Sequence, residues 1–276
     1  MNRRLAVPFG WGLRYAAAAL IAAAFIFPFY WMLVTSLNRP DQLYDFPPLL
    51  WPDWQFHNYA DAWSQAPWVR YYVNTVVISA ATTALVLITT SLAGYAFAAM
   101  PFPGKALLFG FVLAIYMVPT EVTIVPNYIT MSTLGWVDSY QAQIVPFGAS
   151  VFGIFLMRQF FLTLPTDLWE AAQLDGCSHL RFLRSIAVPL ARPALVTVGL
   201  FNFVAAWNAF LWPLIVTQTQ TYRPLQVALA VFSQTDDQQP MLLAAGALMT
   251  TLPILILFLF AQRQLVGGIA ATGIRG

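Results

Sequence analysis

The chain has 276 residues, of which 59% are apolar and 9% are charged, and its formal net charge is +2. An ordinary soluble domain carries about 25% charged residues, so this composition excludes a water-soluble fold. The one cysteine, Cys177, excludes an intrachain disulfide and a thiolate metal cluster, and the two histidines, His57 and His179, lie far apart in the sequence. We therefore expect an integral membrane protein with no metal site and no nucleic acid partner.

Six apolar segments are long enough to cross a membrane as helices, which requires about 20 mostly apolar residues each. They cover residues 13–37, 71–99, 106–128, 141–161, 192–216 and 241–261. The first is longer than the roughly 7–15-residue apolar region of a signal peptide, so we interpret it as a retained helix. In the third, Glu121 interrupts the apolar run, and Pro119 and Pro126 are expected to bend or end the helix. The expected fold is all-α, a polytopic membrane protein with a single transmembrane domain over residues 1–276.

The basic residues indicate the orientation of these six helices. If the N-terminus is cytoplasmic, ten of the 13 Lys and Arg residues lie on the cytoplasmic side and only Arg39, Arg70 and Arg223 lie outside. Because cytoplasmic loops carry an excess of Lys and Arg, this distribution predicts that both termini are cytoplasmic.

Residues 162–191, between the fourth and fifth segments, form the most informative loop. Pro165 and Thr166 resemble a helix start, and the acidic residues that follow suit the positive end of a helix dipole. Gly176 is expected to end this helix, and a second short helix fits Ser178–Val188, before Pro189. From the residues alone, this helix–turn–helix could dock into a cleft on a partner or lie on the membrane surface as a solvated loop.

A known pattern runs through this loop: Glu170-Ala171-Ala172, Asp175-Gly176, Phe182, Ile186, Pro189-Leu190 and Pro193. It resembles the EAA loop of ATP-binding-cassette (ABC) importer permeases. More narrowly, nearly the whole chain is similar to the carbohydrate-type permease family that includes the second permease of maltose and glycerol-3-phosphate importers. Further matching segments are residues 102–105, 155–161 and 207–214. Cys177 departs from the pattern, because the family usually has alanine there.

The resemblance implies a type I ABC importer permease fold in the plasma membrane of a bacterium or archaeon. The implied partners are a second homologous permease, two ATPase subunits that bind ATP and Mg²⁺, an extracytoplasmic solute-binding protein and membrane lipid. This chain would bind no cofactor and catalyse no reaction. The ATPase would contact the helix that begins near Thr166, and the residues implied in this coupling are Glu170, Ala171, Ala172, Asp175, Gly176 and Phe182.

The substrate path is less defined by the sequence. Asn202, Trp207, Asn208 and Trp212 in the fifth segment combine amides with aromatic rings, which suits a sugar, oligosaccharide or polyol phosphate. The same residues could instead mediate helix contacts or sit at the membrane interface. The small polar residues of the second segment, such as those at 74–75 and 89–91, more often mediate helix packing than transport.

An alternative function is an ion-coupled secondary transporter of a small polar solute. Such a protein needs charged residues at membrane depth, and Glu121 is the one acid near a predicted span. The sequence also lacks a Gly-rich phosphate-binding loop, so ATP hydrolysis would have to come from another chain.

Overall fold

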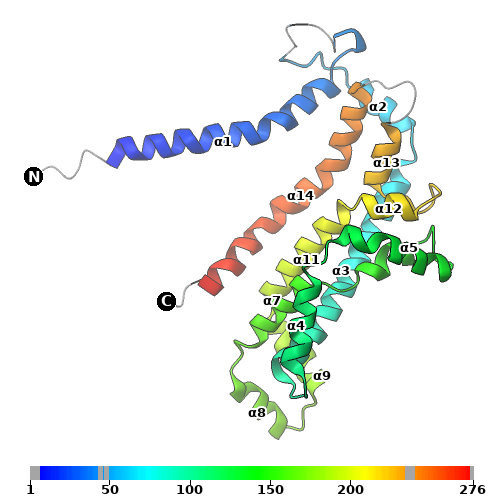
Figure 1. Ribbon diagram of the computed structural model, residues 1–276. Coiled ribbons are helices and arrows are strands. Elements are labelled where there is room, and N and C mark those ends of the chain that lie inside the picture. Colours follow the sequence, from blue (N-terminus) through cyan, green and yellow to red (C-terminus); the bar gives the residue numbers. More distant parts are fainter. Residues whose placement is uncertain (1–6, 43–45, 47–49, 234–239, 274–276) are drawn as a thin grey trace, which may run out of the picture. The chain divides into compact units, whose positions relative to one another are not determined.

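The computed structural model describes residues 7–42, 46, 50–233 and 240–273, with the side chains of 7–10 and 261–273 excepted. All regular elements in this part of the chain are helical (Figure 1). They are α1 (Val7–Ser36), η1 (Pro40–Gln42), α2 (His57–Ser64), α3 (Trp68–Ala99), α4 (Lys105–Ile115), η2 (Thr120–Thr123), α5 (Ile124–Thr133), α6 (Tyr140–Ile144), η3 (Val145–Phe147), α7 (Val151–Phe161), α8 (Thr166–Leu174), α9 (His179–Phe182), the π-helix η4 (Leu183–Ala187), α10 (Val188–Leu190), α11 (Arg192–Trp207), α12 (Leu211–Val216), α13 (Leu225–Phe232) and α14 (Pro240–Gly273). The prediction that both termini are cytoplasmic falls partly on residues 1–6 and 274–276, which lie outside the described residues.

Among the described residues, three helices are long and apolar enough to cross a membrane, and the number of spans reaches the predicted six if each of three bent helix pairs counts as one. Long apolar helices cover Trp11–Ser36, Trp68–Ala99 and Pro240–Phe260. Three pairs of shorter helices also pass as spans if each bent pair is counted as one: Lys105–Ile115 with Thr120–Thr133, Tyr140–Phe147 with Val151–Phe161, and His179–Leu190 with Arg192–Trp207. The fold class predicted from the sequence is therefore confirmed.

The predicted third span, residues 106–128, is a bent pair whose two helices meet at 93°. Pro119 explains the break, because a proline disfavours helical backbone at the residue before it. The bend expected from this proline is confirmed. In the predicted fourth span, residues 141–161, the pair bends by 45° between residues 147 and 151.

Within the predicted fifth span, residues 192–216, the helix is interrupted. Helix α11 ends at Trp207, and α12 begins only at Leu211. Pro213 supplies the physical reason, because its ring would collide with the carbonyl group of residue 209 in an unbroken helix and it has no N–H to donate.

The described chain separates into two compact units, Met1–Pro67 with Leu229–Leu252, and Trp68–Ala228 with Pro253–Gly276. In the first unit, Ala62 packs with Met241, Leu242 and Ala245. The buried amide of Asn58 donates to the carbonyls of residues 36 and 38, at 2.9 and 3.0 Å. These bonds satisfy carbonyl groups that the end of α1 leaves without helical partners.

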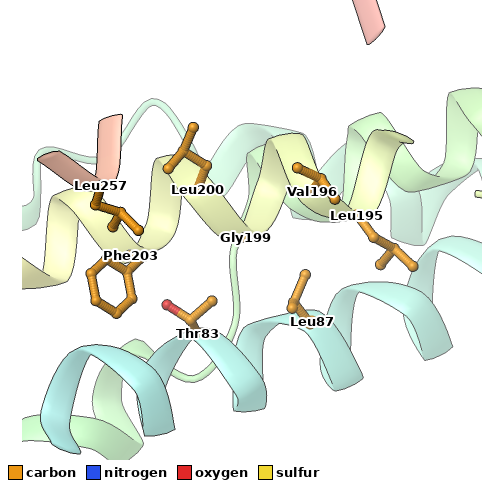
Figure 2. Close-up of a pocket in the computed structure, with 8 residues that line it drawn as sticks. All are labelled: Thr83, Leu87, Leu195, Val196, Gly199, Leu200, Phe203 and Leu257. Carbon is orange, nitrogen blue, oxygen red and sulfur yellow. The ribbon is translucent and has the colours of Figure 1, made fainter. Parts of the chain in front are cut away.

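In the second unit, α3 packs along both α7 and α11 (Figure 1). The contact with α7 is very close at Gly94, where an added Cβ would lie 2.7 Å from the Cβ of Met157. The contact with α11 is looser, and an apolar groove of about 350 Å³ lies beside Gly199, between Leu87 and Phe203 (Figure 2). Helix α3 is thus the element on which α7 and α11 assemble.

Candidate functional site

Loop 162–191 folds into a short helix, a turn and a second helix, as its sequence predicts. Helix α8 occupies residues Thr166–Leu174, and α9, the π-helix and α10 follow one another without a gap from His179 to Leu190. Figure 1 shows α8 beyond the end of α7, with α9 on its return toward α11. The loop therefore presents α8 at one end of the second unit.

The end of α8 is defined by a glycine in a left-handed conformation. Gly176 has φ of 72°. Its N–H donates to the carbonyl of Gln173, and the N–H of Cys177 donates to the carbonyl of Ala172, both at 2.9 Å. This pair of bonds is a Schellman motif, which satisfies the last carbonyl groups of a helix and favours glycine at this position. The predicted role of Gly176 in ending the helix is confirmed.

The second helix begins as predicted but does not end before Pro189. The hydroxyl of Ser178 accepts a bond from the N–H of Arg181 at 3.4 Å and so caps the helix. Pro189 lies inside the helix, two residues after a π-helix over Leu183–Ala187. Because proline cannot donate to the carbonyl four residues earlier, widening the preceding turn removes the collision and lets the helix continue. The predicted boundary at Val188 was therefore two residues short.

The six residues implied in coupling divide into an exposed and a buried group. Glu170, Ala171, Asp175 and Gly176 are exposed. Ala172 and Phe182 are buried, with 7% and 3% of their surface exposed. The exposed carboxylates could meet a basic partner, whereas Ala172 and Phe182 hold α8 against the rest of the chain. Their direct contact with an ATPase stays a prediction.

The exposed surface of α8 also contains Leu174, which the sequence analysis did not single out. It is the last residue of the helix, and 91% of its surface is exposed. A single exposed apolar side chain identifies no contact by itself, but Leu174 adds an apolar group to the acidic outer surface of α8. Its position one residue before Asp175 was visible in the sequence, but its exposure depends on how α8 packs.

The buried side of the loop belongs to an apolar cluster. Its fully buried members are Tyr95 from α3, Met157 and Phe161 from α7, Ala172 from α8, and Phe182, Leu183, Ala187 and Ala191 from the second helix and the turn that follows it. Helix α8 is therefore joined to two membrane helices by close packing, which transmits displacement because protein interiors are dense and nearly incompressible.

The four residues predicted for the substrate path do not form one exposed surface. Trp212 is buried and donates its ring N–H to the carbonyl of Ala142 at 2.9 Å. Trp207 is also buried, and Asn202 donates to the hydroxyl of Thr83 at 3.2 Å. The side chain of Asn208 alone among the four is exposed, in the break between α11 and α12. Substrate contact by any of the four stays a prediction.

A polar network fixes the segment 217–225 at the end of the second unit opposite α8. The amide of Asn74 donates to the carbonyls of Thr221 and Arg223, at 3.0 and 2.9 Å, and accepts from the hydroxyl of Tyr140 at 2.7 Å. Gln143 donates to the carbonyl of Tyr222 at 3.0 Å. These contacts join residues far apart in the sequence, which is why local patterns did not indicate them.

Asp138 holds the beginning of the same segment. Its carboxylate accepts from the N–H of Gln218 at 3.0 Å and from the N–H and hydroxyl of Thr219 at 3.1 and 2.7 Å. Burial acts to raise the pKa of the Asp138 carboxyl, but these bonds, with nearby Arg223, outweigh burial and lower the pKa. The carboxylate is therefore charged and bonded at neutral pH.

Comparison with known proteins agrees with this architecture. Residues 87–266 match the family described as binding-protein-dependent transport system inner membrane component. The chain is 31% identical over 264 residues to the arabinooligosaccharides transport system permease protein AraQ of Bacillus subtilis, covering 93% of each chain. It is also 31% identical over 264 residues to the trehalose/maltose transport system permease protein MalG of Thermococcus litoralis, covering 94% of this chain and 95% of that one.

A solved structure shares the fold. It is that of a bacterial ABC transporter involved in the import of the acidic polysaccharide alginate, with a TM-score of 0.84 and 22% identity over 95% of this chain and 98% of the other. The family match covers loop 162–191 and the helices that hold it, so it includes the segment whose residues suggested this class of protein. The chain belongs to the family of inner membrane components of binding-protein-dependent transport systems.

Proposed function

We propose that this chain forms half of the translocation path of an ATP-driven importer and that α8 docks on a cytoplasmic ATPase subunit. The observation that carries the proposal is the structure of loop 162–191. Its outer surface presents the carboxylates of Glu170 and Asp175 beside the exposed Leu174, and its inner surface is packed on α3 and α7. A short helix with one exposed face and one tightly packed face can be displaced by a partner and can transmit that displacement to the membrane helices on which it packs.

The proposed assembly contains a second, homologous permease, two ATPase subunits and an extracytoplasmic solute-binding protein. Both termini of this chain are on the cytoplasmic side, in agreement with the distribution of Lys and Arg. ATP and Mg²⁺ bind to the ATPase subunits, and their closure moves α8. The relatives named for arabinooligosaccharides and for trehalose and maltose support a sugar or oligosaccharide as the substrate.

Within the path, we propose Asn208 as the substrate contact among the predicted residues. Its side chain is exposed where the helix is broken, and its amide donates to the carbonyl of Val204 at 2.9 Å. The amide oxygen accepts from Gln226 at 3.4 Å, a long bond that a sugar hydroxyl could replace. Replacing Asn208 with alanine is expected to raise the substrate KM without loss of the ATPase subunit.

Charge reversal on α8 tests the proposal. The chain is co-expressed with its cognate permease and ATPase, and the ATPase that co-purifies is measured together with uptake in cells. Glu170→Lys is expected to lose both, because it places a cation against a basic partner surface. Asp61→Lys is the matched control, since it makes the same change in an exposed side chain of α2. Normal uptake and normal ATPase retention in the Glu170→Lys variant would exclude this role of α8.

A second experiment separates the proposal from an ion-coupled carrier. Uptake by an ion-coupled carrier would depend on Glu121 and on the ion gradient, and it would survive depletion of ATP. We expect Glu121→Gln to retain uptake and ATP depletion to abolish it. Uptake that is lost in Glu121→Gln and in the presence of an ionophore, but continues without ATP, would support the ion-coupled carrier instead.

A further inference from the structure

Three aromatic side chains from three helices meet where loop 162–191 packs against α3. We call Tyr95 of α3, Trp169 of α8 and His179 of α9 the aromatic clamp. The hydroxyl of Tyr95 lies 2.9 Å from Nδ1 of His179, within hydrogen-bond distance. The imidazole ring of His179 stacks on the indole ring of Trp169, with 4.1 Å between ring centroids and 14° between ring planes. His179 therefore contacts α3 through its ring edge and α8 through its ring face.

Apolar rings fix the position of Tyr95. Phe161 meets its ring edge-on at 5.9 Å and 87°, and Phe182 lies 6.1 Å from it. Only 3% of the Tyr95 surface is exposed, so its hydroxyl points into a largely dry cluster. A buried hydroxyl without a partner is unfavourable, and in the described part of the chain His179 is the partner of this hydroxyl. The hydrogen bond therefore specifies where His179 sits.

Trp169 is the member of the clamp that belongs to α8. The other inward residue of α8, Ala172, is small and fixes little by itself. The indole ring of Trp169 stacks on His179 and meets Phe182 edge-on at 5.1 Å and 80°. One face-to-face contact and one edge-on contact together restrict both tilt and rotation of α8, because each has a preferred geometry.

We propose that the aromatic clamp sets the angle between α8 and α3, and that Tyr95 and His179 are positioning residues that couple displacement of α8 to α3. This proposal rests on the proposed function of α8 as the ATPase contact. A rotation of α8 without α3 would break either the stack on Trp169 or the bond to Tyr95. With the clamp intact, the two helices move together. Without the clamp, α8 can follow the ATPase while α3 lags behind.

A double-mutant cycle tests the proposal in the assembled transporter. Tyr95→Phe removes the hydroxyl and keeps the ring. His179→Phe keeps a ring against Trp169 and removes the nitrogen. Each is compared with a variant that makes the same chemical change at an exposed site, Tyr116→Phe or His57→Phe. Three quantities are measured: the amount of ATPase subunit that co-purifies, the rate of ATP hydrolysis with the liganded binding protein, and the substrate transported per ATP in proteoliposomes.

We expect both clamp variants to retain the ATPase subunit and to hydrolyse ATP at near the normal rate. Transport per ATP is expected to fall by a factor of about five or more, because coupling between two sites in a protein usually changes a binding constant by at least that factor. The double variant should be no worse than either single variant, because all three lack the same bond. His179→Gln, whose side-chain amide can still bond the Tyr95 hydroxyl, should restore part of the transport per ATP.

Three results would overturn the proposal: unchanged transport per ATP in both single variants, a parallel fall of hydrolysis and transport, or fully additive effects in the double variant. A parallel fall would mean that the clamp only holds the loop together. Retention of the ATPase by the unaltered chain and its loss in Glu170→Lys report on the proposed function, whereas transport per ATP reports on the clamp. The two failures are therefore distinguishable.

Discussion

Gly94 lies where α3 meets α7, and a methyl group added there would not fit. An ideal Cβ at residue 94 would be 2.7 Å from the Cβ of Met157 and 3.0 Å from the backbone nitrogen of Arg158. Real Cβ contacts essentially never lie under 3.0 Å and are ordinary from 3.4 Å, so Met157 must retreat by 0.3 Å at the least and by 0.7 Å to reach an ordinary contact, the differences of 3.0 and 3.4 Å from 2.7 Å. Because both neighbours belong to or adjoin the α7 backbone, the whole helix has to shift. Such overpacking costs about 1–3 kcal/mol.

Gly199 of α11 provides the matched control for a Gly94→Ala variant. An added Cβ at residue 199 would meet Leu87 at 3.5 Å and Thr83 at 3.8 Å, both ordinary contacts (Figure 2). Both glycines lie inside helices, so each substitution gains about 1 kcal/mol of helix propensity. That gain cancels in the comparison. Gly94→Ala should therefore be less stable than Gly199→Ala by the overpacking cost alone, about 1–3 kcal/mol.

This difference is measured by thermal unfolding of the purified transporter in detergent, with loss of the α3–α7 contact as the signal. A pair of cysteines, one on α3 and one on α7, reports the displacement of α7 through the rate at which the two form a disulfide. Gly199→Ala should unfold at or slightly above the temperature of the unaltered protein, and Gly94→Ala below the Gly199→Ala variant. Equal unfolding temperatures for the two variants would show that α3 and α7 do not approach as closely as described, and would remove the structural basis for their joint movement.

Three further predictions test local features. Gly176→Ala forces a left-handed conformation on alanine and should destabilise loop 162–191 by about 1–2 kcal/mol. The loop should then be cleaved faster by a protease, and an unchanged rate of cleavage would contradict the helix-ending role of Gly176. Trp212→Phe leaves the carbonyl of Ala142 unpaired and should cost about 1–3 kcal/mol in thermal unfolding. Trp207→Phe should cost less, since the Trp207 ring N–H has no partner among the described atoms; the reverse order would be inconsistent with these contacts. Asp138 has a lowered pKa when folded, so its stabilising bonds to segment 217–225 are present above about pH 4 and are lost as pH falls through that lowered value. Hydrogen exchange of the segment should therefore accelerate in acid, and Asp138→Asn should show the fast rate at neutral pH; a pH-independent rate in the unaltered protein would contradict this assignment.

The sequence was sufficient to predict an all-helical membrane fold and the two helices of loop 162–191. Both depend on local information: the length of apolar runs, and the helix-ending property of Gly176. The break after Trp207 was not predicted, although its cause is local. Pro213 lies six residues beyond that break, and a proline near a helix end can equally well start a new helix. Hydropathy alone cannot distinguish these two outcomes.

The residues of the site were harder to place than the elements that carry them. The resemblance of the loop indicated Glu170 and Asp175, and both are exposed on α8. It could not indicate that Phe182 is buried against Tyr95, because all of α4 to α8 lies between these two residues in the sequence. The pairing of Tyr95 with His179 is equally long-range, because the two residues are 84 positions apart in the sequence. Contacts of this kind arise only once α3, α7 and α9 have packed.

The polar residues of α3 explain how broken spans can exist in a lipid environment. A helix break exposes N–H and carbonyl groups that lipid cannot satisfy. Thr89 donates to the carbonyl of Gly148, at the bend between α6 and α7, at 2.7 Å. Thr75 accepts from the N–H of Leu225, at the start of α13, at 2.8 Å, and Asn74 bonds two carbonyls of segment 217–225. The packing role predicted for these small polar residues is confirmed for these three.

Since α3 satisfies backbone groups of its broken neighbours, a displacement of α3 must carry the bend at Gly148 and the segment 217–225 with it. The uninterrupted helix thus links the end of the second unit near α8 to the end of that unit near Asp138.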